Sequence, residues 1–137
     1  MAKNAKILIV EDDKSIRDLY DLKLTKAGFN VLTAENGGVG WDMATKELPD
    51  LILLDVMMPV MNGFEVLKKL RNKTETKEIP VVILSNYGEV DQMTQGFLVG
   101  ATDYLIKAEH TPSDVLDIVN ETLKNKGNIA GVAFQDE

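Results

Sequence analysis

The chain of 137 residues contains no cysteine, which excludes a disulfide framework and any metal site built on thiolates. It also has no hydrophobic run of the length that crosses a bilayer. The N-terminal segment is followed by only four apolar residues before acids begin, too few for the core of a signal peptide. From these absences we expect a protein of the reducing cytoplasm that does not enter a membrane.

Positive charge is scarce, with 15 lysines and arginines against 22 acidic residues and a net charge of -7. A surface with this balance repels phosphate backbones and anionic lipids, so we expect no direct binding to nucleic acid. Hydrophobic residues make up 45% of the chain and charged ones 27%, which is ordinary for a globular domain. We expect one domain at residues 5–126. The segment 127–137 is unpatterned and predicts a loose tail, although its apolar part, 129–134, could dock elsewhere.

Short apolar runs alternate with helical periodicity along the whole chain. The run 51–54 is apolar on both faces, which indicates a central parallel strand, and similar runs stand at 6–10, 29–34, 81–84 and 104–106. Helical patterns follow each of them. Five such repeats predict an α/β fold, a (βα)5 chain with a doubly wound parallel sheet of five strands and helices on both faces.

The helices are delimited by capping and turn residues. The first is expected to end at Gly28 and to bury one stripe, and the second is expected over 40–47 after a turn at 36–38. A third is marked by 64–70, and a weaker one is expected over 90–99. For the last helix, Thr111 predicts the N-cap and Pro112 the first helical position. The lone histidine, His110, is expected to be exposed and inert. The stripe of the first helix comprises Ile16, Leu19, Tyr20, Leu24 and Ala27.

Chemically active side chains follow four of the five predicted strands. Because the carboxyl ends of parallel strands share one edge of the sheet, these side chains should converge there. Each has an ordinary explanation alone, since acids cap helices, serines end strands and lysines lie on surfaces. Their convergence is the functional signal. The residues are Glu11, Asp12, Asp13, Asp55, Ser85 and Lys107.

Carboxylates gathered in this way repel one another, and a divalent cation relieves the repulsion. Carboxylate oxygens select hard ions, and an incomplete protein shell that leaves room for water and phosphate suits Mg²⁺. Lys107 adds a positive charge that can pair with a phosphoryl oxygen, and Ser85 adds a hydroxyl donor. The edge therefore predicts phosphoryl transfer onto Asp55.

Four segments of the chain form a set of motifs in a fixed order. They are ILIVEDD at 7–13, LILLDVMMPVMNG at 51–63, IPVVILS at 79–85 and GATDYLIK at 100–107. Together they resemble the receiver domain of two-component response regulators, of the stand-alone CheY-like type. The resemblance covers about residues 5–125 and implies a flavodoxin-like fold with strand order 2-1-3-4-5.

Carried over residue by residue, the resemblance implies that Asp55 is the phosphoacceptor. Asp12 would bind Mg²⁺ directly and Glu11 through water, and the backbone carbonyl of Met57 would complete the protein ligands together with Asp55. Asp13 is expected to open the first helix instead.

The resemblance also implies a switch. Ser85 would hydrogen-bond the phosphoryl group and Lys107 would contact it, while Tyr104 would turn inward when the serine moves. Without the family, Tyr104 would be taken for an ordinary half-buried strand residue. The implied partners are a sensor histidine kinase or histidine phosphotransfer protein, and a downstream protein that binds the face formed by the fourth helix, fifth strand and fifth helix. The chain would be a monomer or a phosphorylation-dependent dimer, and no enzyme beyond assisting its own phosphorylation and dephosphorylation.

The chain departs from the family pattern in several positions. Ala108 stands where a proline, often with a cis bond, usually follows the lysine, so we expect either a trans bond with an altered loop or a strained bond. Asn86 replaces a very small residue, and Met57 and Tyr87 are bulky at positions that tune dephosphorylation. We therefore predict slow loss of phosphate from Asp55.

Three other classes of protein place different demands on the same positions. A hydrolase of the haloacid dehalogenase type would need a second acid at Met57, and a flavin binder would need a phosphate loop where Glu11, Asp12 and Asp13 repel phosphate. A receiver-like interaction module that is never phosphorylated stays open, because Asn86 and Ala108 are unusual.

Overall fold

A computed structural model describes residues 4–58, 61–86 and 90–131 of the chain. In these ranges five strands alternate with five α-helices, and a short 3-10 helix precedes the last of them. The elements are β1 (Lys6–Val10), α1 (Lys14–Lys26), β2 (Asn30–Ala34), α2 (Gly37–Glu47), β3 (Leu51–Asp55), α3 (Gly63–Arg71), β4 (Val81–Ser85), α4 (Val90–Val99), β5 (Asp103–Ile106), η2 (Lys107–Glu109) and α5 (Pro112–Gly131).

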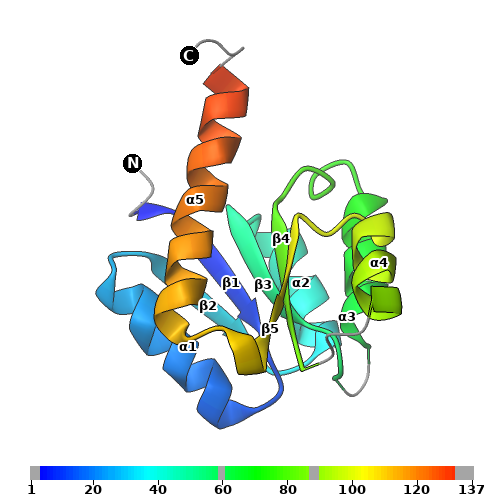
Figure 1. The fold of residues 1–137 in the computed structure, drawn as a ribbon. Coiled ribbons are helices and arrows are strands. Elements are labelled where there is room, and N and C mark those ends of the chain that lie inside the picture. The colour runs from blue at the N-terminus through cyan, green and yellow to red at the C-terminus, as the bar shows by residue number, and fades with distance from the viewer. Residues whose placement is uncertain (1–3, 59–60, 87–89, 132–137) are drawn as a thin grey trace.

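The five strands form one sheet in the order β2-β1-β3-β4-β5, and every neighbouring pair is parallel. Figure 1 shows α1 and α5 on one face of this sheet and α2, α3 and α4 on the other. The predicted fold class and strand order are confirmed. Since every crossover brings the chain back in the same direction, all five strand ends reach one edge.

The sheet separates two hydrophobic layers. Leu51 and Leu53 of β3 pack in the layer under α1 and α5, whereas Ile52 and Leu54 pack in the layer under α2, α3 and α4. All four are at most 1% exposed. A strand buried on both faces needs apolar residues at every position, which explains why the run 51–54 shows no alternation.

Polar side chains cap the helices at their N-termini. The Thr111 hydroxyl accepts from the Asp114 N–H at 3.1 Å, and the Asp114 carboxylate accepts from the Thr111 N–H at 2.9 Å, so the predicted start of α5 is confirmed. The expected turn at 36–38 is wrong. Asn36 instead caps α2, because its side chain accepts from the Val39 N–H, and α2 begins at Gly37. A Cβ at residue 37 would collide with the backbone carbonyl of Met61, so this helix start requires glycine.

Two side chains lie differently from expectation. Leu19 was expected in the buried stripe of α1 but is 49% exposed, because the buried face of α1 centres on Tyr20 and Leu24 and residue 19 is turned about 100° away from Tyr20. His110 is half-buried, not exposed, and its Nδ1 lies 3.1 Å from the carbonyl oxygen of Ile106.

The C-terminal part of the chain is more ordered than predicted. The helix α5 continues to Gly131, through positions that were expected to belong to a loose tail. In Figure 1 its last turns project beyond the sheet. Residues 132–137, which include the end of the apolar piece 129–134, lie outside the described residues.

The backbone after β5 has ordinary geometry. None of the described residues has a cis peptide bond, so Lys107 and Ala108 are joined by a trans bond and begin the short helix η2. Of the two alternatives for this position, trans geometry is confirmed. Within the described ranges, every helix is too short or too polar to cross a bilayer.

Candidate functional site

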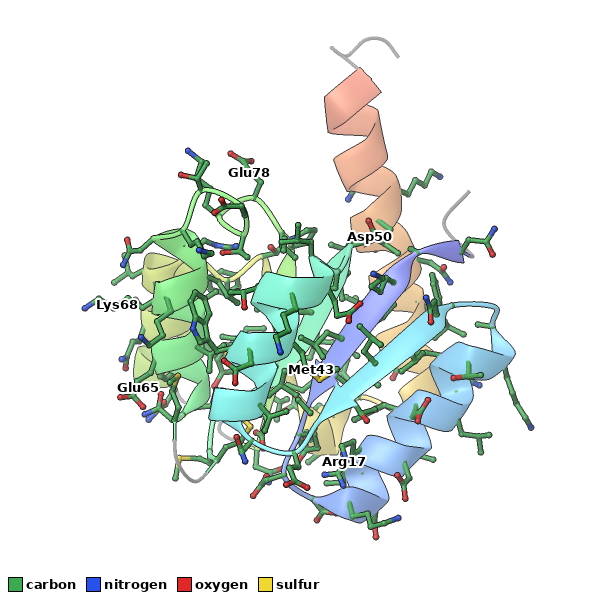
Figure 2. The ribbon with its side chains drawn as sticks, turned by 180° about the vertical axis from the view of Figure 1, so that it is seen from behind. Arg17, Met43, Asp50, Glu65, Lys68 and Glu78 are labelled. Carbon is green, nitrogen blue, oxygen red and sulfur yellow. The ribbon has the colours of Figure 1, made fainter. Side chains whose placement is uncertain are left out.

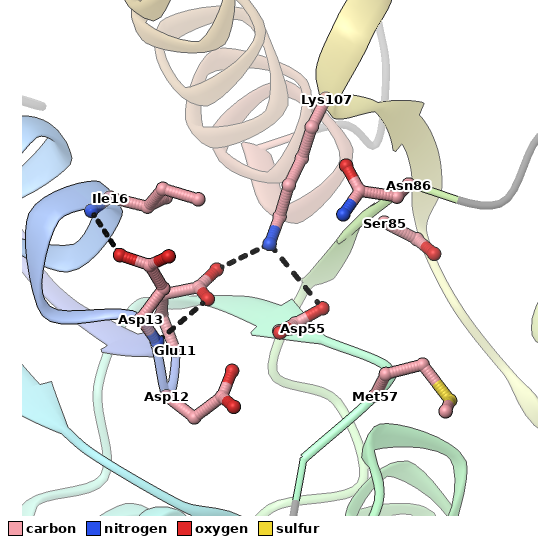
Figure 3. A pocket seen from close by; sticks show the side chains of 9 residues that line it. All are labelled: Glu11, Asp12, Asp13, Ile16, Asp55, Met57, Ser85, Asn86 and Lys107. Carbon is pink, nitrogen blue, oxygen red and sulfur yellow. Dashed lines mark hydrogen bonds and ion pairs between the residues drawn. The ribbon is translucent and has the colours of Figure 1, made fainter.

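The strand order brings the predicted site residues together at one edge of the sheet. Because β1, β3, β4 and β5 are consecutive neighbours, the residues at or just after their carboxyl ends lie side by side. Together they surround a cavity of about 250 Å³, shown from close by in Figure 3. The cavity is lined by Glu11, Asp12, Asp13, Ile16, Asp55, Met57, Ser85, Asn86 and Lys107.

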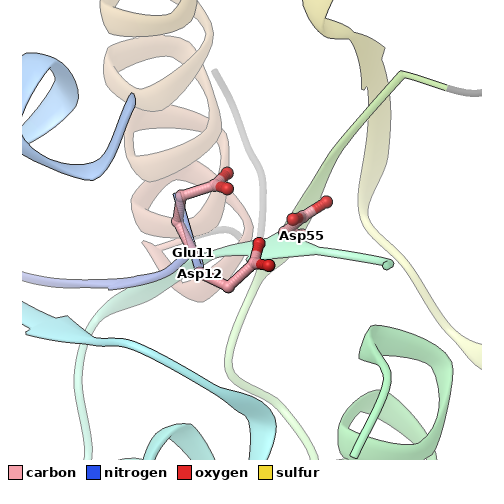
Figure 4. Close-up of side chains that lie close together, drawn as sticks. All are labelled: Glu11, Asp12 and Asp55. Carbon is pink, nitrogen blue, oxygen red and sulfur yellow. The ribbon is translucent and has the colours of Figure 1, made fainter. Parts of the chain in front are cut away.

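Three carboxylates meet in this cavity. Glu11, Asp12 and Asp55 each offer one oxygen, and these oxygens lie within 4.8 Å of one another, as Figure 4 illustrates. Glu11 is 2% exposed and Asp55 is 6% exposed, whereas Asp12 is open to solvent. The structure thus brings together two deeply buried acids and one exposed acid, and solvent reaches the cluster from the side of Asp12.

Lys107 reaches into the cluster from the far edge of the sheet. Its Nζ lies 2.7 Å from Glu11 Oε1 and 3.5 Å from Asp55 Oδ1 (Figure 3). The Lys107 side chain is 10% exposed. Residues more than 40 positions apart in sequence therefore form a buried network of two carboxylates and one ammonium group. Desolvated pairs of this kind have much stronger mutual interactions than surface pairs.

The network shifts the protonation of its members. Burial, together with the negative charge of Glu11, raises the pKa of Asp55 to about 7, and Lys107 opposes this effect. Burial alone would lower the pKa of the Lys107 ammonium, but the hydrogen bond to Glu11 and the charge of Asp55 raise it above its ordinary value. Without a metal ion, Asp55 is therefore a carboxyl group with a pKa near neutral pH, beside a lysine whose pKa lies above its ordinary value.

The loop between β1 and α1 fixes the direction of the acidic pair. Asp13 caps α1 by accepting from the Ile16 N–H at 3.2 Å, as predicted, and its own N–H donates to Glu11 Oε2 at 3.1 Å. Arg17 Nη1 donates to the carbonyl oxygen of Glu11 at 2.8 Å and reaches that of Asp12 at 3.5 Å. Sequence reasoning missed Arg17, since an arginine on the polar side of an amphipathic helix gives no signal that it binds a particular loop.

The remaining predicted residues lie around the cavity or behind it. Ser85 is 1% exposed and lines the cavity, and Asn86 and the 57% exposed Met57 form part of its rim. Tyr104 does not line it. It is 4% exposed and packs in the hydrophobic layer on the side of α4, so it is more deeply buried than a half-buried strand residue. Tyr87 lies outside the described residues.

The donor set suits a hard divalent cation. It consists of carboxylate oxygens alone, without the imidazole or thiolate ligands that favour zinc. Burial and the negative charge of Glu11 raise the pKa of Asp55, and a cation beside the cluster would favour the ionised carboxylate again. An acidic group of this composition, open to solvent on one side, fits Mg²⁺ with part of its water shell retained.

One family model and several characterised relatives match the chain. The family model described as response regulator receiver domain matches residues 7–120. Protein PilH of Pseudomonas aeruginosa is 42% identical over 105 residues, which cover 75% of this chain and 85% of PilH. The DNA-binding dual master transcriptional regulator RpaA of Synechocystis is 41% identical over 114 residues, 83% of this chain, and this chain spans only 46% of RpaA.

Two solved structures with a similar fold carry related descriptions. The chemotaxis protein CheY4 of Vibrio cholerae is 36% identical, with a TM-score of 0.81 over 86% of this chain and 98% of that chain. A CheY-like receiver domain protein of Methanospirillum hungatei is 27% identical, with a TM-score of 0.84 over 90% of this chain and 97% of that chain.

Proposed function

Because the chain belongs to the family of response regulator receiver domains, we propose that it accepts a phosphoryl group on Asp55 from a histidine kinase or a histidine phosphotransfer protein. One observation carries the proposal: Asp55 lies within reach of both a buried ammonium group, 3.5 Å away, and two further carboxylates. Among the carboxylate residues that line the cavity, Asp55 alone belongs to a strand, and it is the last residue of β3. Family membership makes the chain a signalling module, with histidine kinases or phosphotransfer proteins as partners.

Asp55 is the nucleophile in this proposal. A bond forms between a carboxylate oxygen of Asp55 and phosphorus while the P–N bond of the donor's phosphohistidine breaks, and its electron pair returns to the imidazole nitrogen. Asp12 and Asp55, the Met57 carbonyl and, through water, Glu11 would hold Mg²⁺, which supplies positive charge for the phosphoryl oxygens and favours ionised Asp55.

Two further side chains of the cavity complete the proposed chemistry. Lys107 pairs with one phosphoryl oxygen, because its Nζ already lies 3.5 Å from the acceptor carboxylate. Ser85 directly follows Leu84, the β4 residue that pairs with Asp55. In this proposal the Ser85 hydroxyl group donates a hydrogen bond to a second phosphoryl oxygen. The same constellation assists hydrolysis of the aspartyl phosphate, so the chain acts on its own phosphate and on no separate substrate.

Phosphorylation adds about -1.5 to -2 charges next to Ser85, and we propose that Ser85 and Tyr104 transmit this change to the face made of α4, β5 and α5. Phe97 and Leu98 of α4 support this choice of partner surface, since they are 47% and 81% exposed. The downstream partner in this proposal is another protein. The chain itself is a monomer, or a dimer that forms on phosphorylation. The cytoplasmic location stays a prediction from the sequence.

The phosphoacceptor is tested by incubating the protein with Mg²⁺ and a small phosphodonor and measuring its intact mass. We expect one added phosphoryl group, which is lost in the Asp55→Asn variant and in samples treated with EDTA. Asp42→Asn is the matched control, because Asp42 is an exposed aspartate on α2. Unchanged mass in the wild-type protein would instead favour the interaction module that keeps the fold but receives no phosphate.

A further inference from the structure

Arg17 is the side chain that ties α1 to the loop carrying the acidic pair. It lies on the first turn of α1, and Figure 2 shows its side chain beside the end of β1. One of its nitrogens, Nη1, donates to the Glu11 carbonyl at 2.8 Å and lies 3.5 Å from the Asp12 carbonyl. A single guanidinium group thus spans the two residues whose carboxylates face Asp55.

The Glu11 backbone is held on both sides by fixed partners. Its N–H donates to the carbonyl of Ala34 at the end of β2, at 3.0 Å, and its carbonyl accepts from Arg17. Rotation of the peptide group between Glu11 and Asp12 would break the second contact and would redirect both side chains together. The contact with Arg17 therefore opposes this rotation of the peptide group.

Arg17 also adds positive charge next to a site in which carboxylates outnumber cationic side chains. The cavity is lined by four carboxylates and by one cationic side chain, Lys107, among the described residues. Arg17 does not line the cavity, but its hydrogen bonds to the loop carbonyls place a second positive group directly behind the acids. Its planar head with several donors suits two adjacent carbonyls, whereas a lysine ammonium acts as a single point charge.

We propose that Arg17 is a positioning residue for the acidic pair, which holds the carboxylates of Glu11 and Asp12 in the arrangement that binds a divalent cation. This inference rests on the proposed function, since it assumes that the acidic cluster binds Mg²⁺. Hydrogen-bonded groups behind the ligands of a metal commonly change its affinity by tenfold or more. Arg17 stands in this position, because it binds the backbone carbonyls of Glu11 and Asp12, the two residues whose carboxylates would face the metal.

The test compares Arg17→Gln with Lys14→Gln in the full chain. Lys14 also lies in the first turn of α1, but it is exposed and pairs with Asp18 at 2.6 Å, so its replacement removes the same charge without touching the loop. Isothermal titration calorimetry with MgCl₂ measures the dissociation constant. We expect Arg17→Gln to weaken Mg²⁺ binding about tenfold. Lys14→Gln should stay within about twofold of wild type, since an exposed charge is screened by solvent.

Arg17→Lys keeps the charge but loses the planar fork, and we expect Mg²⁺ affinity between those of wild type and Arg17→Gln. This variant also serves if Arg17→Gln does not fold. Melting temperatures in EDTA separate a general loss of stability from a change at the site. The proposal is overturned if a folded Arg17→Gln or Arg17→Lys variant binds Mg²⁺ as wild type does, or if Lys14→Gln loses as much affinity. Wild-type protein that binds no Mg²⁺ would overturn the proposed function itself.

Discussion

The Lys107 ammonium lies closer to the Glu11 carboxylate, at 2.7 Å, than to the Asp55 carboxylate, at 3.5 Å. Lys107 is the one cationic side chain among the described residues that line the cavity. Glu11 therefore competes with Asp55 for this ammonium group. If Asp55 is phosphorylated as we propose, the phosphoryl group has to draw the ammonium away from Glu11, so we expect the ion pair between Lys107 and Glu11 to favour the unphosphorylated state.

Replacing Lys107 by methionine should destabilise the metal-free protein. The substitution keeps an apolar stem of similar length but leaves Glu11, at 3% side-chain exposure, without its cationic partner. Breaking a buried pair on one side costs about 3 kcal/mol in the free energy of unfolding. Urea denaturation in EDTA at pH 8 measures this loss, and added Mg²⁺ should restore part of it because the cation takes over charge compensation.

Lys14→Met provides the comparison, since it removes an exposed lysine that pairs with Asp18. We expect it to change the unfolding free energy by less than about 0.5 kcal/mol. Equal losses in the two variants would contradict the assignment of Lys107 as the charge that balances the buried acids.

Asp55→Asn should stabilise the protein at alkaline pH when no metal is present. In the folded chain burial and Glu11 raise the pKa of Asp55 to about 7, against an ordinary value of 3.8. Between these two values the folded state binds more protons than the unfolded state, so wild-type stability falls as the pH rises from about 4 to about 7. Asparagine has no such cost. At pH 8 in EDTA we expect the variant to be more stable by about 2 to 4 kcal/mol.

Thermal unfolding of both proteins from pH 4 to pH 8 tests this difference. The gap should close toward pH 4, where Asp55 is largely protonated in the folded state, and should shrink at pH 8 when Mg²⁺ is added to the wild type. A gap that does not depend on pH would show that Asp55 titrates at its ordinary value.

Asn86→Ala should speed the loss of phosphate from Asp55. The asparagine side chain lines the cavity, and we expect it to restrict the approach of water to a phosphoryl group on Asp55. We expect an increase of about fivefold, which corresponds to a barrier lower by about 1 kcal/mol. The measurement follows phosphorylated protein after removal of the donor, with the exposed Asn120→Ala on α5 as control. A wild-type lifetime of only seconds in Mg²⁺ buffer would refute the expected slow dephosphorylation.

Gly96 of α4 makes room for the ring of Tyr104. A Cβ at this position would lie 3.0 Å from Tyr104 Cδ2 and 3.1 Å from Ile83 Cδ1. Alanine favours a helix interior over glycine by about 1 kcal/mol, but here the ring has to shift. We expect Gly96→Ala to raise the free energy of unfolding of the wild-type protein by less than this amount. In a Tyr104→Val background the same substitution should raise it by about 0.5 kcal/mol more.

A double-mutant cycle by urea denaturation measures this coupling between α4 and β5. Additive effects of the two substitutions would mean that the ring does not depend on the glycine. In that case Tyr104 could turn without any rearrangement of α4.

Much of the fold follows from local patterns that the sequence displays openly. The unalternating run 51–54 predicts a central strand because burial on both faces requires apolar side chains throughout, and Thr111 with Asp114 predicts the start of α5 because capping depends on neighbours in sequence. The same logic failed at residues 36–38. Two glycines there indicate a turn, but close approach to Met61, distant in sequence, is what requires glycine in the first turn of α2.

The convergence of Glu11, Asp12, Asp55, Ser85 and Lys107 at one edge could also be predicted, because parallel strands of a (βα)5 chain end on the same side. Their roles in phosphoryl transfer remain proposals. The sequence by itself determined which side chains reach the edge, since each follows directly from its position at the end of a strand.

The tertiary structure alone decided which of these side chains touch. That Lys107 pairs with Glu11 more closely than with Asp55, that Arg17 binds the loop carbonyls, and that Leu19 is exposed depend on the spacing and rotation of elements packed against one another. Such distances of a few ångströms arise from the packing of the whole core, which no local pattern in the sequence encodes.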